Sequence, residues 1–114
     1  MSRRPAWTDR ENAALACLYC DMLGLATAGH AYNKAGMIRS YQGTDDAPEA
    51  LHGRSRGSIE AKLMNATACH AKLQPEAVTM DGHGYRALVN YQAALLTAMR
   101  AELVNATARE ARRA

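Results

Sequence analysis

The densest group of residues that could do chemistry is a polar run in the middle of the chain. It reads Gly53-Arg54-Ser55-Arg56-Gly57-Ser58-Ile59-Glu60-Ala61-Lys62-Leu63-Met64-Asn65. We expect this run to cross from a loop into a helix, where free backbone N–H groups and the positive end of the helix dipole favour a bound anion. Glycines beside the arginines let the backbone come close to a ligand. The chemistry that this pattern favours is the binding of phosphate.

The same run also has a purely structural interpretation. Ser55 can simply cap the helix, while Arg54, Arg56 and Glu60 form ion pairs in solvent. Exposed pairs of this kind contribute little to stability. The residue types alone leave both interpretations open.

Other reactive side chains are scattered. Cys17 and Cys20 form a C-x-x-C pair, and Cys69 with His70 could complete a zinc site. However, the C-x-x-C pair falls in the middle of a predicted helix, so we expect all three cysteines to be small hydrophobic core residues. The four histidines show no spacing typical of a catalytic triad. We therefore predict a protein that is not an enzyme and has no metal or cofactor.

The composition indicates which elements must position these residues. The chain has 114 residues, with 24 alanines and 11 leucines against three valines, two isoleucines and no phenylalanine. Alanine and leucine favour helices, whereas strands need the β-branched and aromatic residues that are scarce here. We predict one all-α domain over residues 1–114, a bundle of about four helices with irregular loops. A basic arm covers residues 1–6, and an arginine-rich end covers residues 109–114.

Local signals place the helices. A capping box at Thr8 and Glu11 starts the first helix, which we expect to end between Gly24 and Gly29. We expect the others at residues 32–42, 55–73 and 88–109, with a short helical turn at 49–51. In the third helix an apolar stripe through Ile59 and Leu63 lies beside a polar flank that includes Ser58, Lys62 and Asn65.

Charge and hydropathy narrow the classes of partner and the cellular location that we expect for this protein. The formal net charge is +3 and the isoelectric point is about 8.9, which suits a polyanionic partner without requiring one. No stretch approaches the roughly 20 apolar residues of a membrane helix, and the first residues lack an apolar signal core. We expect a cytoplasmic protein with no membrane partner and with reduced cysteines.

Several short motifs together resemble a known group of proteins. Trp7-Thr8 and Asn33-Lys34 precede the polar run from Gly53 to Asn65, and Gly84-Tyr85-Arg86 and Asn90-Tyr91-Gln92 follow it. The chain resembles the N-terminal helical accessory domain that precedes the nuclease module in bacterial and phage HNH-type endonucleases. In that group a proline usually follows the Gly-Tyr-Lys segment, where this chain has Ala87. The chain ends where the nuclease module would begin, so the resemblance implies nucleic-acid contact and not cleavage.

From the resemblance and the polar run we expect a non-catalytic module that binds nucleic acid, DNA rather than RNA. Arg54, Arg56 and Lys62 with Ser55 and Ser58 would hold phosphate, and Lys34, Arg39, Asn65 and Arg86 would make secondary contacts. We expect Arg54 and Arg56 to be exposed, so that their removal weakens binding without unfolding the domain.

Two alternatives stay open. The first is a phage or mobile-element inhibitor of the anti-CRISPR type, which binds and blocks a host nucleoprotein complex through the same surface. The second is a homo-oligomeric scaffold, in the simplest case a homodimer, built through the alanine- and leucine-rich helices.

Overall fold

The computed structural model describes residues 6–113, the last of these without its side chain. Within this part the chain forms four helices: α1 Asp9–Thr27, α2 Lys34–Gln42, α3 Arg56–Leu73 and α4 Ala93–Arg113. The predicted all-α bundle is confirmed. Apart from Ala6, the arm predicted over residues 1–6 lies outside the described residues, as does Ala114 at the arginine-rich end.

Capping residues set the helix starts close to where the sequence predicts them. The Thr8 hydroxyl accepts from the Glu11 N–H and the Glu11 carboxylate accepts from the Thr8 N–H, which completes the capping box of α1. Asn33 caps α2, so that helix begins at Lys34 and not at residue 32. Ser55 caps α3. Short polar side chains at these positions satisfy backbone donors that a helix start leaves unpaired.

Two predictions about the remaining segments are wrong. Residues 50–53 form turns and not a helical turn at 49–51. The fourth helix begins at Ala93, five residues later than predicted. The reason is that α3 takes the backbone groups of Leu88: its N–H donates to the Met64 carbonyl at 3.0 Å, and its carbonyl accepts from the Asn65 amide at 2.8 Å. Residues 88–92 are therefore held against α3 as a segment without regular secondary structure.

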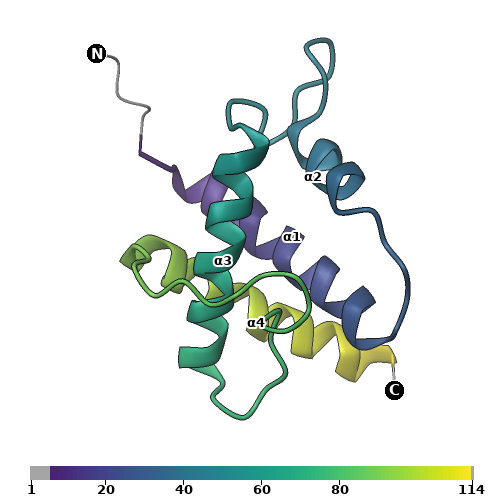
Figure 1. Ribbon diagram of the computed structural model, residues 1–114, viewed down its shortest axis with the longest axis vertical. Coiled ribbons are helices and arrows are strands. Elements are labelled where there is room, and N and C mark those ends of the chain that lie inside the picture. The colour runs from purple at the N-terminus through teal and green to yellow at the C-terminus, as the bar shows by residue number, and fades with distance from the viewer. Residues whose placement is uncertain (1–5, 114) are drawn as a thin grey trace.

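The core lies where three helices meet. Figure 1 shows α1 and α4 side by side and running in the same direction, with α3 crossing them and α2 to one side. The largest buried apolar side chains are Leu15, Leu18, Tyr19, Met22, Ile38, Leu51, Ile59, Leu63, Met80, Leu95 and Met99. The long loop between α3 and α4 contributes Met80, and its remaining part lies along α3. The first half of α3 is thus fixed on several sides, and this half carries the polar run.

Candidate nucleic-acid interface

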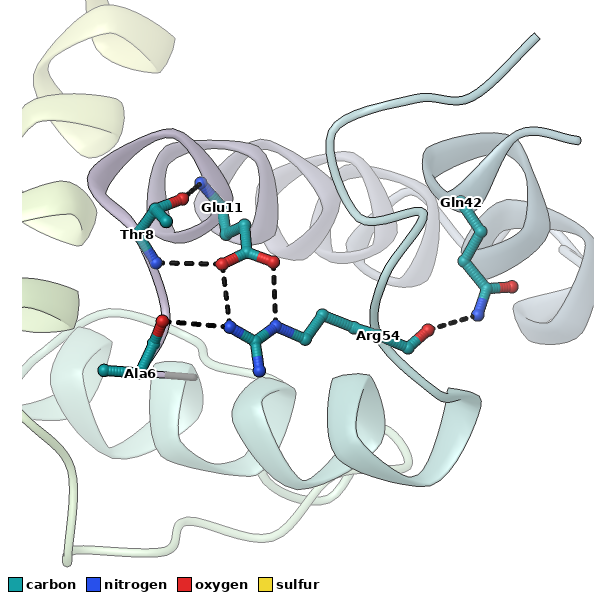
Figure 2. A network of polar contacts seen from close by, with 5 residues as sticks. All are labelled: Ala6, Thr8, Glu11, Gln42 and Arg54. Atoms are coloured by element: carbon teal, nitrogen blue, oxygen red, sulfur yellow. Dashed lines mark hydrogen bonds and ion pairs between the residues drawn. The ribbon is translucent and has the colours of Figure 1, made fainter. Parts of the chain in front are cut away.

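Arg54 reaches away from α3 to the first turn of α1, where it forms a two-pronged ion pair with Glu11 (Figure 2). Its Nε donates to Glu11 Oε2 at 2.7 Å, and its Nη2 donates to Glu11 Oε1 at 2.9 Å. Nη2 also donates to the Ala6 carbonyl at 3.0 Å, and the guanidinium lies 4.9 Å from the centroid of the Trp7 ring. Arg54 is only 7% exposed. The prediction of an exposed Arg54 is therefore wrong.

Arg54 connects three helices through its side chain and its backbone carbonyl. The hydrogen bonds from Arg54 lower the pKa of Glu11 to about 2, so the carboxylate stays ionised across the neutral range. The Arg54 carbonyl accepts from the Gln42 side-chain amide of α2 at 2.8 Å, as Figure 2 also shows. Arg54 thus joins the start of α3 to both α1 and α2, and we exclude it from the candidate contact surface.

In the first turn of α3, Ser55 caps the helix and Arg56 pairs with Glu60, as the structural interpretation of the polar run predicts. This turn nevertheless remains exposed to solvent. The Ser55 hydroxyl accepts from the Ser58 N–H at 3.2 Å. Arg56 pairs with Glu60 through Nε and Oε1 at 2.9 Å, and the Arg56 side chain is 59% exposed. A pair that exposed costs little to break. Arg56 can therefore exchange Glu60 for a phosphate.

Lys62 is a half-buried cation with an unusual environment. Its ammonium lies 5.3 Å from the centroid of the Trp7 ring and 3.5 Å from Gln92 Oε1. Burial, followed by the charge of Arg54, lowers the pKa of Lys62. Within residues 6–112, no carboxylate lies within ion-pair distance of it. The charge of Lys62 is therefore balanced only by an aromatic face and an amide oxygen.

Asn65 and Lys34 hold the loop before α4 in place. The Asn65 amide donates to the Leu88 carbonyl at 2.8 Å and lies 3.4 Å from Asn90 Oδ1, and Asn65 is 8% exposed. The Lys34 ammonium lies 4.5 Å from the centroid of the Tyr85 ring and donates to the Gly84 carbonyl at 3.4 Å. Both side chains were predicted as secondary ligand contacts, but these bonds give them a structural role.

The other two predicted contacts are both exposed. Arg86 lies in the loop next to Tyr85, whose hydroxyl donates to Glu60 Oε2 at 3.5 Å. Arg39 lies on α2, and no hydrogen bond or ion pair seen in residues 6–112 joins its side chain to α3 or to the loop. Tyr85, the neighbour of Arg86, thus contacts the polar run and places Arg86 next to it in the chain, whereas Arg39 lies on a separate helix.

These contacts define a candidate interface, which we name the α3–loop surface. It consists of Arg56, Ser58 and Lys62 on α3 and Arg86, Asn90 and Gln92 in the loop. Besides the two hydrogen bonds of Leu88, helix and loop are joined by the contacts of Lys62 with Gln92, Asn65 with Asn90 and Glu60 with Tyr85. Three cations with neighbouring hydroxyl and amide groups can bind phosphate and hydrogen-bond a sugar or a base edge.

Residues from the separate motifs meet in pairs around this surface. The pairs are Trp7 with Arg54, Trp7 with Lys62, Lys34 with Tyr85, Glu60 with Tyr85, Lys62 with Gln92, and Asn65 with Asn90. Sequence reasoning missed Glu11, the partner of Arg54 from 43 residues away. The capping box already gives Glu11 a local role, so no sequence signal pointed to this second one.

A hollow of about 700 Å³ lies beside the Arg54–Glu11 pair, between the starts of α1 and α3. Arg10 and His52 border it. His52 Nδ1 lies 2.9 Å from the Gln42 carbonyl, and its Nε2 lies 3.3 Å from Asp45. Because Glu11, Arg54 and His52 already have protein partners, the hollow adds nothing to the α3–loop surface.

The cysteines are free thiols on two helices. Cys69 is fully buried, as predicted, while Cys17 and Cys20 are half-buried on α1. Burial raises the pKa of Cys17 and Cys69 to about 11 and that of Cys20 to about 12. In the part of the chain that the structure describes, no three histidine, cysteine or acidic side chains gather in a way that could hold a metal ion.

Comparison with known proteins adds no relative. No protein-family model matches the chain, and no curated protein or solved structure is significantly similar to it. Across the described helices, none combines the length and apolar character needed to cross a bilayer.

Proposed function

We propose that this domain binds nucleic acid, DNA rather than RNA, through the α3–loop surface and has no catalytic role of its own. The resemblance to an endonuclease accessory domain supports the proposal. We infer a cytoplasmic location, because the proposed partner is found there.

The observation that carries the proposal is positive charge left without a strong partner. Arg56 has only an exposed pair with Glu60, Lys62 contacts an amide and a ring, and Arg86 is exposed. No ion pair within residues 6–112 involves Lys62 or Arg86. A phosphate backbone would supply the missing counter-charge for all three cations.

Titration of a labelled random DNA duplex of about 20 base pairs, followed by fluorescence anisotropy at several salt concentrations, tests this proposal. Three phosphate contacts predict that log affinity falls against log salt with a slope of about 2 to 3. The double variant Arg56→Ala, Arg86→Ala should bind more weakly, and its slope should be smaller by about 2.

Lys72→Ala is the matched control for charge, because Lys72 is exposed about 24 Å further along α3 from Arg56. It should bind like the unchanged protein. The absence of binding even at low salt, or an equal loss in the Lys72 variant, would refute the proposed surface.

The inhibitor of a host nucleoprotein complex remains the second candidate, because one observation favours a protein partner. Val89 lies on the same loop, next to Asn90, and is 80% exposed. An apolar side chain that enters a pocket of a partner can anchor a protein interface. In this case a partner should stay bound after nuclease digestion of a lysate, and the uncharged variant Val89→Ser should release it while leaving the affinity for DNA almost unchanged.

A further inference from the structure

The aromatic side chains of this domain are turned inward. The chain has one tryptophan and five tyrosines, all within the described residues, and each is buried or half-buried. Tyr85, which stands beside the α3–loop surface, is only 4% exposed. None of these tryptophan and tyrosine rings is therefore exposed enough to serve as an open platform for a base.

Two rings beside the α3–loop surface, Trp7 and Tyr85, are also covered by the protein's own cations, and Tyr91 in the loop itself is half-buried. The Arg54 guanidinium and the Lys62 ammonium lie 4.9 and 5.3 Å from the centroid of the Trp7 ring. The Lys34 ammonium lies 4.5 Å from that of Tyr85. A base could stack on either ring only by displacing a charge from it, and Arg54 is fixed there by Glu11.

Proteins that bind single strands without sequence preference depend on such stacking in addition to a basic groove. The α3–loop surface offers guanidinium, ammonium, hydroxyl and amide groups without a free ring. These groups suit the sugar–phosphate backbone and base edges, and a duplex presents about twice the charge per unit length of one strand. The surface is thus built for contacts that a duplex supplies.

We propose that the α3–loop surface binds duplex DNA through its backbone, in preference to single-stranded DNA. This inference rests on the proposed function and specifies its ligand. Arg54 and Lys62 occupy the Trp7 ring. Arg56 and Arg86 contact phosphates, and Lys62 contacts a phosphate from its position beside the ring.

The test compares two labelled probes on the intact chain, a 20-base-pair duplex of random sequence and a 20-nucleotide oligothymidine, in the same buffer. We expect the duplex to bind at least about tenfold more tightly at moderate salt. Trp7 is the single tryptophan, so its emission reports stacking directly. Saturating oligothymidine should leave that emission unquenched.

The outcomes separate this inference from the proposed function. Equal or tighter binding of the single strand, or strong quenching of Trp7 by it, would overturn the preference for duplex while leaving nucleic-acid binding intact. Failure of both probes to bind at low salt would overturn the proposed function itself. Neither result depends on a variant that could fail to fold.

Discussion

Arg54 and Arg56 are two residues apart and have different roles. Arg56 is exposed beside Glu60, whereas Arg54 is buried against Trp7 and Glu11. The sequence identifies both as basic residues at a helix start, but the difference depends on where the partner of each lies. Glu60 is one turn away from Arg56 on the same helix, whereas Glu11 is on a different helix from the segment that carries Arg54. Only the Arg56–Glu60 pair could therefore be predicted from the local spacing of the sequence.

Arg54→Ala should lower the free energy of unfolding by about 2 to 4 kcal/mol, because it leaves the Glu11 carboxylate buried without its partner. Urea unfolding followed by circular dichroism measures this. Arg56→Ala should change the same quantity by less than about 0.5 kcal/mol. Equal effects of the two substitutions would show that the buried pair does not stabilise the fold.

The Arg54–Glu11 pair should also make the stability of the fold depend on pH in the acid range. The pKa of Glu11 is lowered from 4.5 to about 2, so its contribution is complete above about pH 4.5 and is lost as pH falls towards 2. Glu11→Gln should remove this part of the acid sensitivity.

His70 gives a second pH dependence, in a different range. The Tyr19 hydroxyl accepts from the Met80 N–H at 3.2 Å and lies 2.8 Å from His70 Nδ1. In the neutral tautomer with its proton on Nε2, Nδ1 accepts from this hydroxyl. His70 Nε2 can then donate to Gln74 Oε1 at 3.0 Å. Burial lowers the pKa of His70 below its ordinary value of 6.5.

Because the unfolded chain binds this proton more readily, stability should fall as pH decreases from about 7 to 5, by at most about 1.4 kcal/mol per pH unit. Unfolding measured over this range should show a shallower pH dependence in His70→Gln than in the unchanged chain. The slope is the readout, since the variant also loses hydrogen bonds. An identical slope would mean that His70 does not titrate differently on folding.

At the level of the elements, the helix ends were predictable wherever a local signal exists. Thr8 and Ser55 mark the starts of α1 and α3, and Gly43 ends α2 with a positive φ of 70°. The start of α4 was not predictable, because Leu88 bonds to α3 and not to its own helix.

The candidate site was partly predictable for the same reason. The sequence places the cluster at the start of α3, but Lys34 and Asn65 bond to the loop before α4, which lies far from Lys34 in the chain. Their structural roles follow from the fold and not from local spacing.

Two glycines should respond in opposite ways to alanine. At Gly43 a Cβ would collide with the Ala47 carbonyl and the Glu49 N–H, and the backbone is in the left-handed region. Gly43→Ala should cost about 2 kcal/mol or more. Gly57 lies in the first turn of α3 with open space around its Cα, so Gly57→Ala should stabilise by a few tenths to about 1 kcal/mol. Melting temperatures that move in the same direction would contradict this assignment.

At the level of the whole molecule, α1, α3 and α4 enclose one core, and the three thiols report on it. With pKa values of about 11 to 12 against 9.0 for an unperturbed thiol, the thiolate fraction at pH 8 should be about 100- to 1000-fold lower in the folded chain. The rate of reaction with a thiol reagent, measured with and without urea, should therefore rise at least about tenfold on unfolding. A cysteine that reacts equally fast in both conditions would show that its helix face is open to solvent.

Glu11 takes part in two structures at once, the capping box of α1 and the pair with Arg54. The first turn of α1 cannot unwind without releasing the segment that precedes α3. The two helix starts should therefore open in a single local event. The backbone N–H of Asn12 donates to the Thr8 carbonyl, and the backbone N–H of Ile59 donates to the Ser55 carbonyl. These two N–H groups should exchange hydrogen with solvent at closely similar rates, although they belong to different helices.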